Sequence, residues 1–132
     1  LMTGQESRFL ISLLISLIAG LVIGIEREIR KKEAGIRTHI FVIAGSMLFT
    51  FLSSLVDLSS PSRIASNIVI GIGFLGAGII LIENNKVRNL TTAANVWFAA
   101  AIGMLIGFQF YLIAIMATIF AILIPLIPGI RH

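Results

Sequence analysis

The chain has 132 residues, of which 58% are hydrophobic and 12% charged, whereas soluble domains carry roughly 25% charged residues. This composition excludes a soluble globular domain and indicates an integral membrane protein. The formal net charge of +4 is confined to short segments between apolar runs, so it does not indicate a nucleic-acid-binding surface. The absence of cysteine excludes disulfides and thiol chemistry.

Apolar runs long enough to cross a membrane account for most of the chain. A helix needs about 20 mostly apolar residues to span a hydrocarbon core of roughly 30 Å. Five stretches qualify, at about 8–26, 38–56, 63–82, 91–107 and 110–128. We therefore predict an all-α integral membrane protein, a single domain over residues 1–132 built as a bundle of five transmembrane helices.

Basic residues set the expected orientation of this bundle. They cluster between the first and second stretches and recur between the third and fourth. By the positive-inside rule these loops are cytoplasmic, which places the N-terminus outside and the C-terminus in the cytoplasm. We expect a multi-pass protein of the plasma (inner) membrane.

The first stretch carries small residues at four-residue spacing, Ser12, Ser16, Gly20 and Gly24. In lipid, such ridges let helices approach closely. The helix is expected to continue beyond the membrane, because pairs such as Glu26 with Arg30 are spaced i,i+4. The basic cluster follows the apolar run rather than preceding it, so we interpret the run as a retained anchor and not a signal peptide.

The second stretch begins near His39. No second histidine or carboxylate lies at metal-ligand spacing from it. We expect His39 to be an interfacial residue rather than a ligand.

The third stretch contains GIGFLGAGII, whose Gly71, Gly73 and Gly76 match the spacing of a dinucleotide-binding turn. That turn requires a preceding strand and an acidic residue about 20 positions later, and neither is present. At 100° per residue, Gly73 and Gly76 lie on one side of the helix, and Gly71 and Gly78 on the other. Because both sides are smooth, we expect this helix to be central, between the first and fourth.

The fourth stretch carries a further small-residue ridge, Ala99, Gly103 and Gly107. The ridges fit either the core of a monomer or the interface of a homodimer. Capping residues are expected before two helices: Ser60 with Pro61 before the third, and Thr91 or Thr92 before the fourth.

Polar residues gather at two expected depths. The cytoplasmic-side polar cluster comprises Glu26, Arg27, Arg37, Thr38, Glu83, Arg88, Thr91, Thr92 and Asn95. The outer polar cluster comprises Asp57, Arg63 and Asn67. Each is either a functional site or a set of ordinary loop charges and caps, and a surface pair such as Asp57 with Arg63 contributes less than about 1 kcal/mol.

Glu26 is the sharpest site candidate, because an apolar run carries it to the membrane boundary. No phosphate-binding lysine follows the glycines and no serine sits in a nucleophile elbow, so we interpret the chain as non-enzymatic and without a cofactor.

The motifs GIEREIRKKEAGIRTHIFVIAGSMLFT, PSRIASNIVIGIGFLGAGII and VRNLTTAANVWFAAAIGM together resemble the MgtC/SapB family of membrane proteins. The resemblance covers most of the chain. It departs from the family pattern at Ile82, where an arginine is common, and at Asn84 and Asn89, where glycines are usual. Many members also carry a soluble C-terminal domain, which this sequence does not include.

The resemblance implies a role in growth at low magnesium and, in some members, in virulence. It also implies membrane partners such as the F-type ATP synthase or small membrane peptides.

Two functions of different class follow. The first is a regulatory or interaction protein that uses the small-residue ridges to form a homodimer or to bind another membrane protein, with its basic loop on anionic lipid. The second is a magnesium or proton transporter with Glu26, Glu83 and Asn95 at a cytoplasmic-side site, in which Mg²⁺ is a ligand. Between the two clusters only a few hydroxyls are available to a conducting path, so we favour the regulator.

Overall fold

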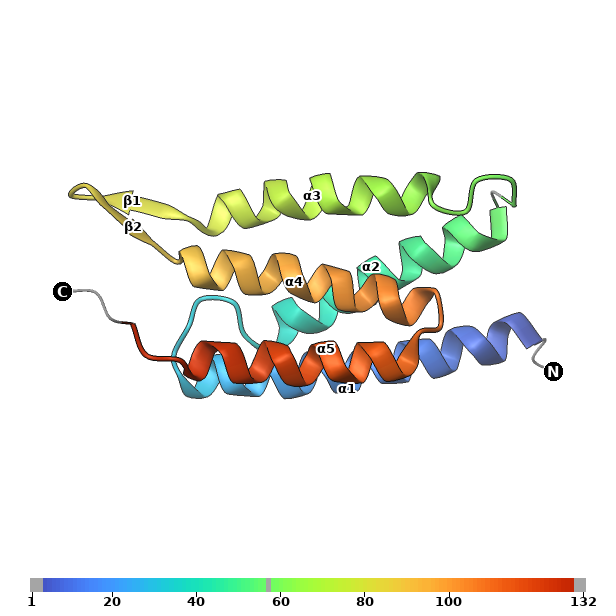
Figure 1. Ribbon diagram of the computed structural model, residues 1–132, viewed down its shortest axis with the longest axis horizontal. Coiled ribbons are helices and arrows are strands. Elements are labelled where there is room, and N and C mark those ends of the chain that lie inside the picture. The colour runs from blue at the N-terminus through green and yellow to red at the C-terminus, as the bar shows by residue number, and fades with distance from the viewer. Residues whose placement is uncertain (1–3, 57, 130–132) are drawn as a thin grey trace.

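The computed structural model describes residues 4–56 and 58–129, which form a predominantly helical bundle (Figure 1). Its elements in chain order are α1 (Gly4–Ile29), α2 (Ile36–Val56), α3 (Arg63–Ile79), β1 (Leu81–Glu83), β2 (Lys86–Arg88), α4 (Leu90–Gly107), α5 (Tyr111–Leu123) and a 3₁₀ turn, η1 (Ile124–Leu126). The predicted helical fold is confirmed.

Among the described residues, three helices, α1, α2 and α4, are long and apolar enough to cross a membrane. α3 and the segment Tyr111–Leu126 are apolar but shorter. Large apolar side chains cover the outside of the bundle, including Phe41 and Phe74. An apolar outer surface of this extent fits a protein surrounded by lipid.

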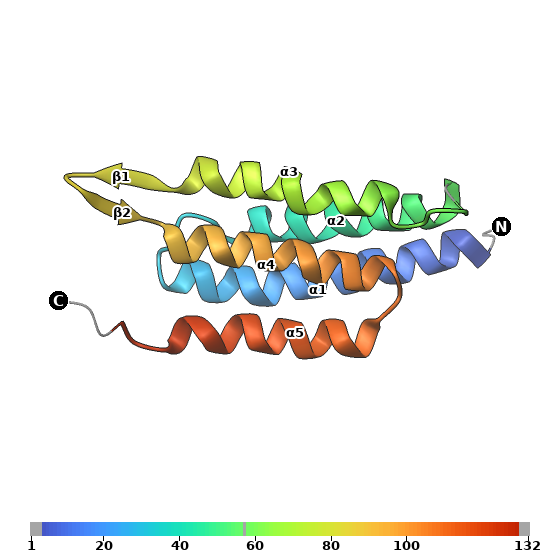
Figure 2. The same ribbon diagram turned by 45° about the horizontal axis from the view of Figure 1, so that its top comes forward.

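The most central helix is α4, because it contacts each of the other helices, and the expectation that the third helix would be central is wrong. α2 packs against both α1 and α4, which also contact each other. α3 contacts α2 and α4, and α5 contacts α1 and α4. Figure 2 shows α3 and α5 on opposite sides of the layer formed by α1, α2 and α4. The physical reason is that the buried face of α4 is lined by small residues, whose glycines pack closely on Ser46 and Thr50 of α2.

Close approach to α2 explains the small residues of α1. A methyl group added at Gly20 would lie 2.6 Å from the Ile40 Cα, and one added at Gly24 would collide with the backbone of Ile36. The ridge of α1 is therefore used inside the monomer.

The ridge of α4 packs on α2 in the same way. A methyl group at Gly103 would lie 2.7 Å from the Ser46 Cβ, and one at Gly107 would lie 2.6 Å from the Thr50 Cβ. Both contacts are backbone-to-helix approaches of the kind that drive helix association in lipid.

α1 ends in a Schellman motif, a pair of backbone hydrogen bonds around a left-handed residue. Lys31 is left-handed with φ 57°, its N–H donates to the Glu28 carbonyl (3.0 Å), and the Lys32 N–H donates to the Arg27 carbonyl (2.9 Å). α4 ends in the same motif at Gln109, with φ 68°. Neither end uses the glycine that usually marks this motif, so the sequence did not reveal it.

A β-hairpin occupies the place where the third helix was expected to continue to residue 82. α3 ends at Ile79, and β1 pairs antiparallel with β2, with Ile82 opposite Val87. Asn84 and Asn85 form the turn with φ of 51° and 63°, values that asparagine tolerates better than other side chains. The hairpin projects beyond the helices (Figure 1).

The expected capping residues are also corrected. α3 begins after Ser62 and α4 after Asn89, and neither residue makes a side-chain capping hydrogen bond. Ser60 instead accepts a backbone hydrogen bond from Arg63 (3.1 Å). Asn89 is left-handed, with φ 64°, which favours a short polar side chain over the expected threonine.

Candidate functional site

The polar end of α1 is organised around a buried cation. Arg27 is 1% exposed, and its Nε lies 3.0 Å from the Glu26 Oε1. The other Glu26 oxygen lies 2.7 Å from the Arg30 Nε. Glu26 thus lies between two guanidinium groups and neutralises a charge that would otherwise be costly to bury. The Arg27 Nη1 atom has no hydrogen-bond partner within the part of the chain that the structure describes.

Glu28 joins α1 to the start of α2. Its Oε2 accepts a hydrogen bond from the Ile36 N–H (2.8 Å), one of the unsatisfied donors at a helix N-terminus. A methyl group at Gly35 would lie 2.6 Å from this carboxylate, so the glycine makes room for it. The segment between Glu26 and Gly35 therefore fixes the end of α1 to the start of α2.

His39 links α2 to α4 and is fully buried within the bundle, in the first turn of α2; its expected place at the membrane interface stays a prediction. Its Nδ1 donates to the Gly35 carbonyl (2.9 Å), and its Nε2 lies 2.7 Å from the Asn95 amide oxygen. Because Nδ1 carries a proton, a neutral ring can only accept at Nε2. A neutral His39 is thus fully satisfied when the Asn95 amide turns its nitrogen toward the ring.

The rest of the cytoplasmic-side polar cluster lies at the same end of the bundle but not in one contact group. Arg37 is exposed on the first turn of α2, and Thr38 beside it is half-buried. Glu83 belongs to β1 and Arg88 to β2. Thr91 and Thr92 lie in the first turn of α4, where Thr92 is buried. Figure 2 shows the hairpin, the start of α4 and the α1–α2 loop together at this end.

A row of buried hydroxyls runs along the interior of the bundle. The Ser12 Oγ lies 2.9 Å from the Tyr111 hydroxyl, and the Ser46 Oγ donates to the Ala100 carbonyl (2.5 Å). Ser53 donates to the Pro61 carbonyl. Ser16 and Thr50 are fully buried, and their hydroxyls have no partner among the described residues.

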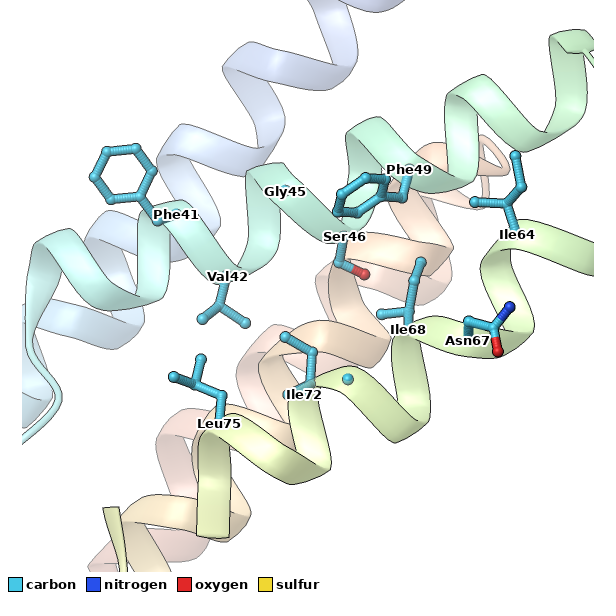
Figure 3. Close-up of a pocket in the computed structure, with 11 residues that line it drawn as sticks. Phe41, Val42, Gly45, Ser46, Phe49, Ile64, Asn67, Ile68, Ile72 and Leu75 are labelled. Carbon is cyan, nitrogen blue, oxygen red and sulfur yellow. The ribbon is translucent and has the colours of Figure 1, made fainter. Parts of the chain in front are cut away.

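An apolar groove separates α2 from α3 on the outside of the bundle (Figure 3). Its volume is about 500 Å³. Phe41, Gly45 and Phe49 line it from α2, and Asn67 and Gly71 from α3. A methyl group added at Gly45 or Gly71 would meet nothing within 4 Å, so both glycines face open space.

The glycines of α3 do not share one role. Gly76 faces α4, where an added methyl group would lie 3.6 Å from the Ala93 carbonyl oxygen. Gly71, Gly73 and Gly78 meet nothing within that range. α3 thus presents a largely unused small-residue surface to the outside, unlike the ridges of α1 and α4. Ala99 lies with Gly103 in the buried face of α4.

The outer polar cluster is only partly described. Asp57 lies outside the described residues. Arg63 and Asn67 are exposed in the first two turns of α3, and the Asn67 amide donates a long hydrogen bond to the Arg63 carbonyl (3.4 Å).

Sequence reasoning missed the burial of Arg27 and His39. For Arg27 a signal existed, because it lies three residues beyond Gly24 on the same ridge of α1. For His39 there was none, since its partner Asn95 is 56 residues away. Within residues 4–56 and 58–129, no three histidine, aspartate or glutamate side chains gather to hold a metal ion.

Comparison with known proteins matches the MgtC family profile to residues 13–128. The chain is 42% identical over 129 residues to the YhiD protein of Escherichia coli K12, whose name describes a proposed magnesium transporter. That match covers 91% of this chain and 60% of the relative.

Two proteins named MgtC are also similar. The chain is 44% identical over 111 residues to that of Salmonella typhimurium LT2, covering 84% of this chain and 48% of the relative. It is 49% identical over 106 residues to that of Brucella abortus, covering 80% and 44%. The chain thus spans between 44% and 60% of the length of these relatives. No solved structure matches.

Proposed function

Since the chain belongs to the MgtC family, we propose that it is a non-enzymatic plasma-membrane protein that supports adaptation to low magnesium by binding a transmembrane helix. In this proposal the chain crosses the membrane five times, with α3 and α5 spanning alongside the three longer helices. A 17-residue helix such as α3 is at the short end of the range that spans a bilayer.

The groove between α2 and α3 carries this proposal (Figure 3). The small-residue ridges of α1 and α4 are buried against α2, whereas Gly45 and Gly71 face open space. Small residues that face lipid leave room for the backbone of another helix. The groove, rather than the buried ridges of α1 and α4, is therefore available as an interface for another helix.

A second copy of this chain is the occupant that these residues favour. Asn67 is exposed on α3 and lines the groove beside Gly71, among apolar side chains. A polar side chain that faces lipid gains from a partner across a helix interface. In a two-fold dimer built on α3, each Asn67 amide meets its own symmetry mate, which can both donate and accept.

The test replaces Gly71 by leucine, which fills the groove without touching the monomer core. We expect Gly71→Leu to abolish dimer cross-linking in membranes and the ability of the protein to restore low-magnesium growth to a bacterial strain lacking its family member. Gly73→Leu is the matched control, because Gly73 is equally open but does not line the groove.

The outcomes separate the possible occupants. Loss of growth together with loss of the dimer identifies a second copy. If the wild-type protein is monomeric and Gly71→Leu still abolishes growth, the occupant of the groove is a helix of another membrane protein. Full growth with Gly71→Leu, at normal protein levels, would contradict the proposal.

The buried hydroxyls favour one alternative, a proton or magnesium pathway. The buried hydroxyls of Ser16 and Thr50 have no partner among the described residues, and His39 contacts Asn95 of the cytoplasmic-side polar cluster. Proton and magnesium flux into liposomes that carry the purified protein tests this function directly. Flux that is lost in Thr50→Val would replace the regulator with a transporter, and absence of flux from folded protein would remove the alternative.

A further inference from the structure

We propose that a cavity at the start of α4 binds a phosphate oxyanion, the group shared by an anionic lipid headgroup and free phosphate. The cavity has a volume of about 280 Å³ and is lined by Lys32, Val87, Asn89, Leu90, Thr91 and Thr92. It lies where the α1–α2 loop, the hairpin and α4 meet, and it is separate from the groove between α2 and α3. Anion binding at this site does not depend on the proposed function.

Backbone donors at this end of α4 have no acceptor among the described residues. The first carbonyl of the helix, that of Asn89, accepts from the Ala93 N–H (2.9 Å). The N–H groups of Leu90, Thr91 and Thr92 precede that bond and are unsatisfied by helix geometry. Asn89 would normally cap one of them, but its amide donates to the Ile79 carbonyl instead (3.2 Å).

Thr92 gives a second and independent indication of a ligand. It is 2% exposed and lines the cavity. Its hydroxyl takes part in none of the side-chain hydrogen bonds formed within the described residues, and it is not among the fully buried oxygens, unlike the unpartnered hydroxyls of Ser16 and Thr50. The Thr92 hydroxyl is therefore available to donate a hydrogen bond to an oxyanion in the cavity.

The charge of the cavity selects an anion. Among the residues that the structure describes, Lys32 is the only charged one that lines it, and none of their ion pairs involves this lysine. The Schellman motif at the end of α1 holds the Lys32 backbone through its bond to Arg27. The N-terminus of an α-helix adds a partial positive charge of roughly half a unit. A cation, a hydroxyl and free N–H groups form the donor set that binds phosphate in proteins.

The depth of the cavity favours the phosphate of a lipid. It lies at the end of the bundle whose loops are basic, which the positive-inside rule places in the cytoplasm. Anionic lipids of the cytoplasmic leaflet place their phosphates at this level.

The experiment measures two ligands on the full chain. In nanodiscs of phosphatidylcholine with a minor share of phosphatidylglycerol, native mass spectrometry counts the phosphatidylglycerol retained by the released protein. In nanodiscs of phosphatidylcholine alone, calorimetry measures the binding of inorganic phosphate. We expect Lys32→Gln and Thr92→Val each to lower the affinity for the bound ligand by about tenfold.

Lys31→Gln is the matched control, because it removes the same charge from the adjacent residue, which does not line the cavity. Selective retention of phosphatidylglycerol identifies a lipid site, and binding of inorganic phosphate identifies a free-anion site; both support the proposal. It is overturned if neither ligand binds, or if Lys31→Gln weakens binding as much as Lys32→Gln. Circular dichroism of each variant verifies that the helices remain folded.

Discussion

At the scale of single residues, the polar end of α1 combines a structural and a candidate functional role. Glu26 neutralises Arg27, which is almost completely buried, and also pairs with Arg30. A loss of activity on mutation of Glu26 can therefore have two causes. Either a functional site is lost, or the fold is destabilised because the buried Arg27 charge is unpaired. Stability and activity have to be measured together.

Glu26→Gln is expected to lower the free energy of unfolding by about 3–5 kcal/mol, because it leaves the Arg27 charge buried without a counter-ion. Thermal unfolding of the purified protein in detergent measures this. The double variant Glu26→Gln/Arg27→Met, which removes the buried charge as well, should recover most of the stability. A single variant as stable as wild type would show that Arg27 does not depend on Glu26.

The same residues show how far sequence reasoning reached at the candidate site. The i,i+4 pairing of Glu26 with Arg30 was predicted and is confirmed. The contact between His39 and Asn95 was not, because the two lie on different helices and no local pattern encodes a tertiary hydrogen bond. Whether the cytoplasmic-side polar cluster is a functional site remains a prediction.

At the scale of the elements, helix identity was predictable and helix neighbours were not. Apolar length identifies five helices, since each must satisfy its own backbone in lipid. The small-residue ridges of α1 and α4 predicted close helix contacts but did not indicate which helix each would contact. α2 has few glycines and was overlooked, although its serines and threonine serve the same purpose. The hairpin was missed because the apolar run of α3 continues without a break into Leu81 and Ile82, which belong to β1.

The two classes of glycine predict opposite responses to one added methyl group. Gly103→Ala should destabilise the protein by about 1–3 kcal/mol, because the new Cβ would collide with the Ile43 carbonyl and Ser46 of α2. Gly73→Ala should be neutral or stabilising by up to about 1 kcal/mol, because the site is open and alanine favours the helix.

Chemical denaturation of both variants in the same detergent compares them directly. Equal destabilisation by Gly103→Ala and Gly73→Ala would contradict the packing of α4 on α2.

At the scale of the whole molecule, the five helices place the start of α1 and the end of α5 at opposite ends of the bundle (Figure 1). The basic α1–α2 loop and the hairpin share one end, and the α2–α3 and α4–α5 connections share the other. The arrangement agrees with five crossings, and the orientation in the membrane remains a prediction from the distribution of charge.

Thiol labelling tests that orientation without interference, because the chain has no cysteine of its own. A cysteine at Lys86 in the hairpin should react with a membrane-impermeant maleimide only after the cells are opened. A cysteine at Leu58, 83% exposed in the α2–α3 connection, should react in intact cells. The reverse pattern would invert the predicted topology, and labelling of both from one side would exclude α3 as a membrane span.

The packing of α2 against α4 also has a consequence for the order of events during synthesis. Ser46 finds its acceptor at Ala100, 54 residues later in the chain. At a synthesis rate of about 5–20 residues per second, α2 waits roughly 3–11 s before α4 emerges to cover it. During that interval only α1 and then α3 shield the helix, and the Ser46 hydroxyl faces lipid or the insertion machinery. The nascent chain is therefore most exposed to quality-control proteases after its first two helices are made.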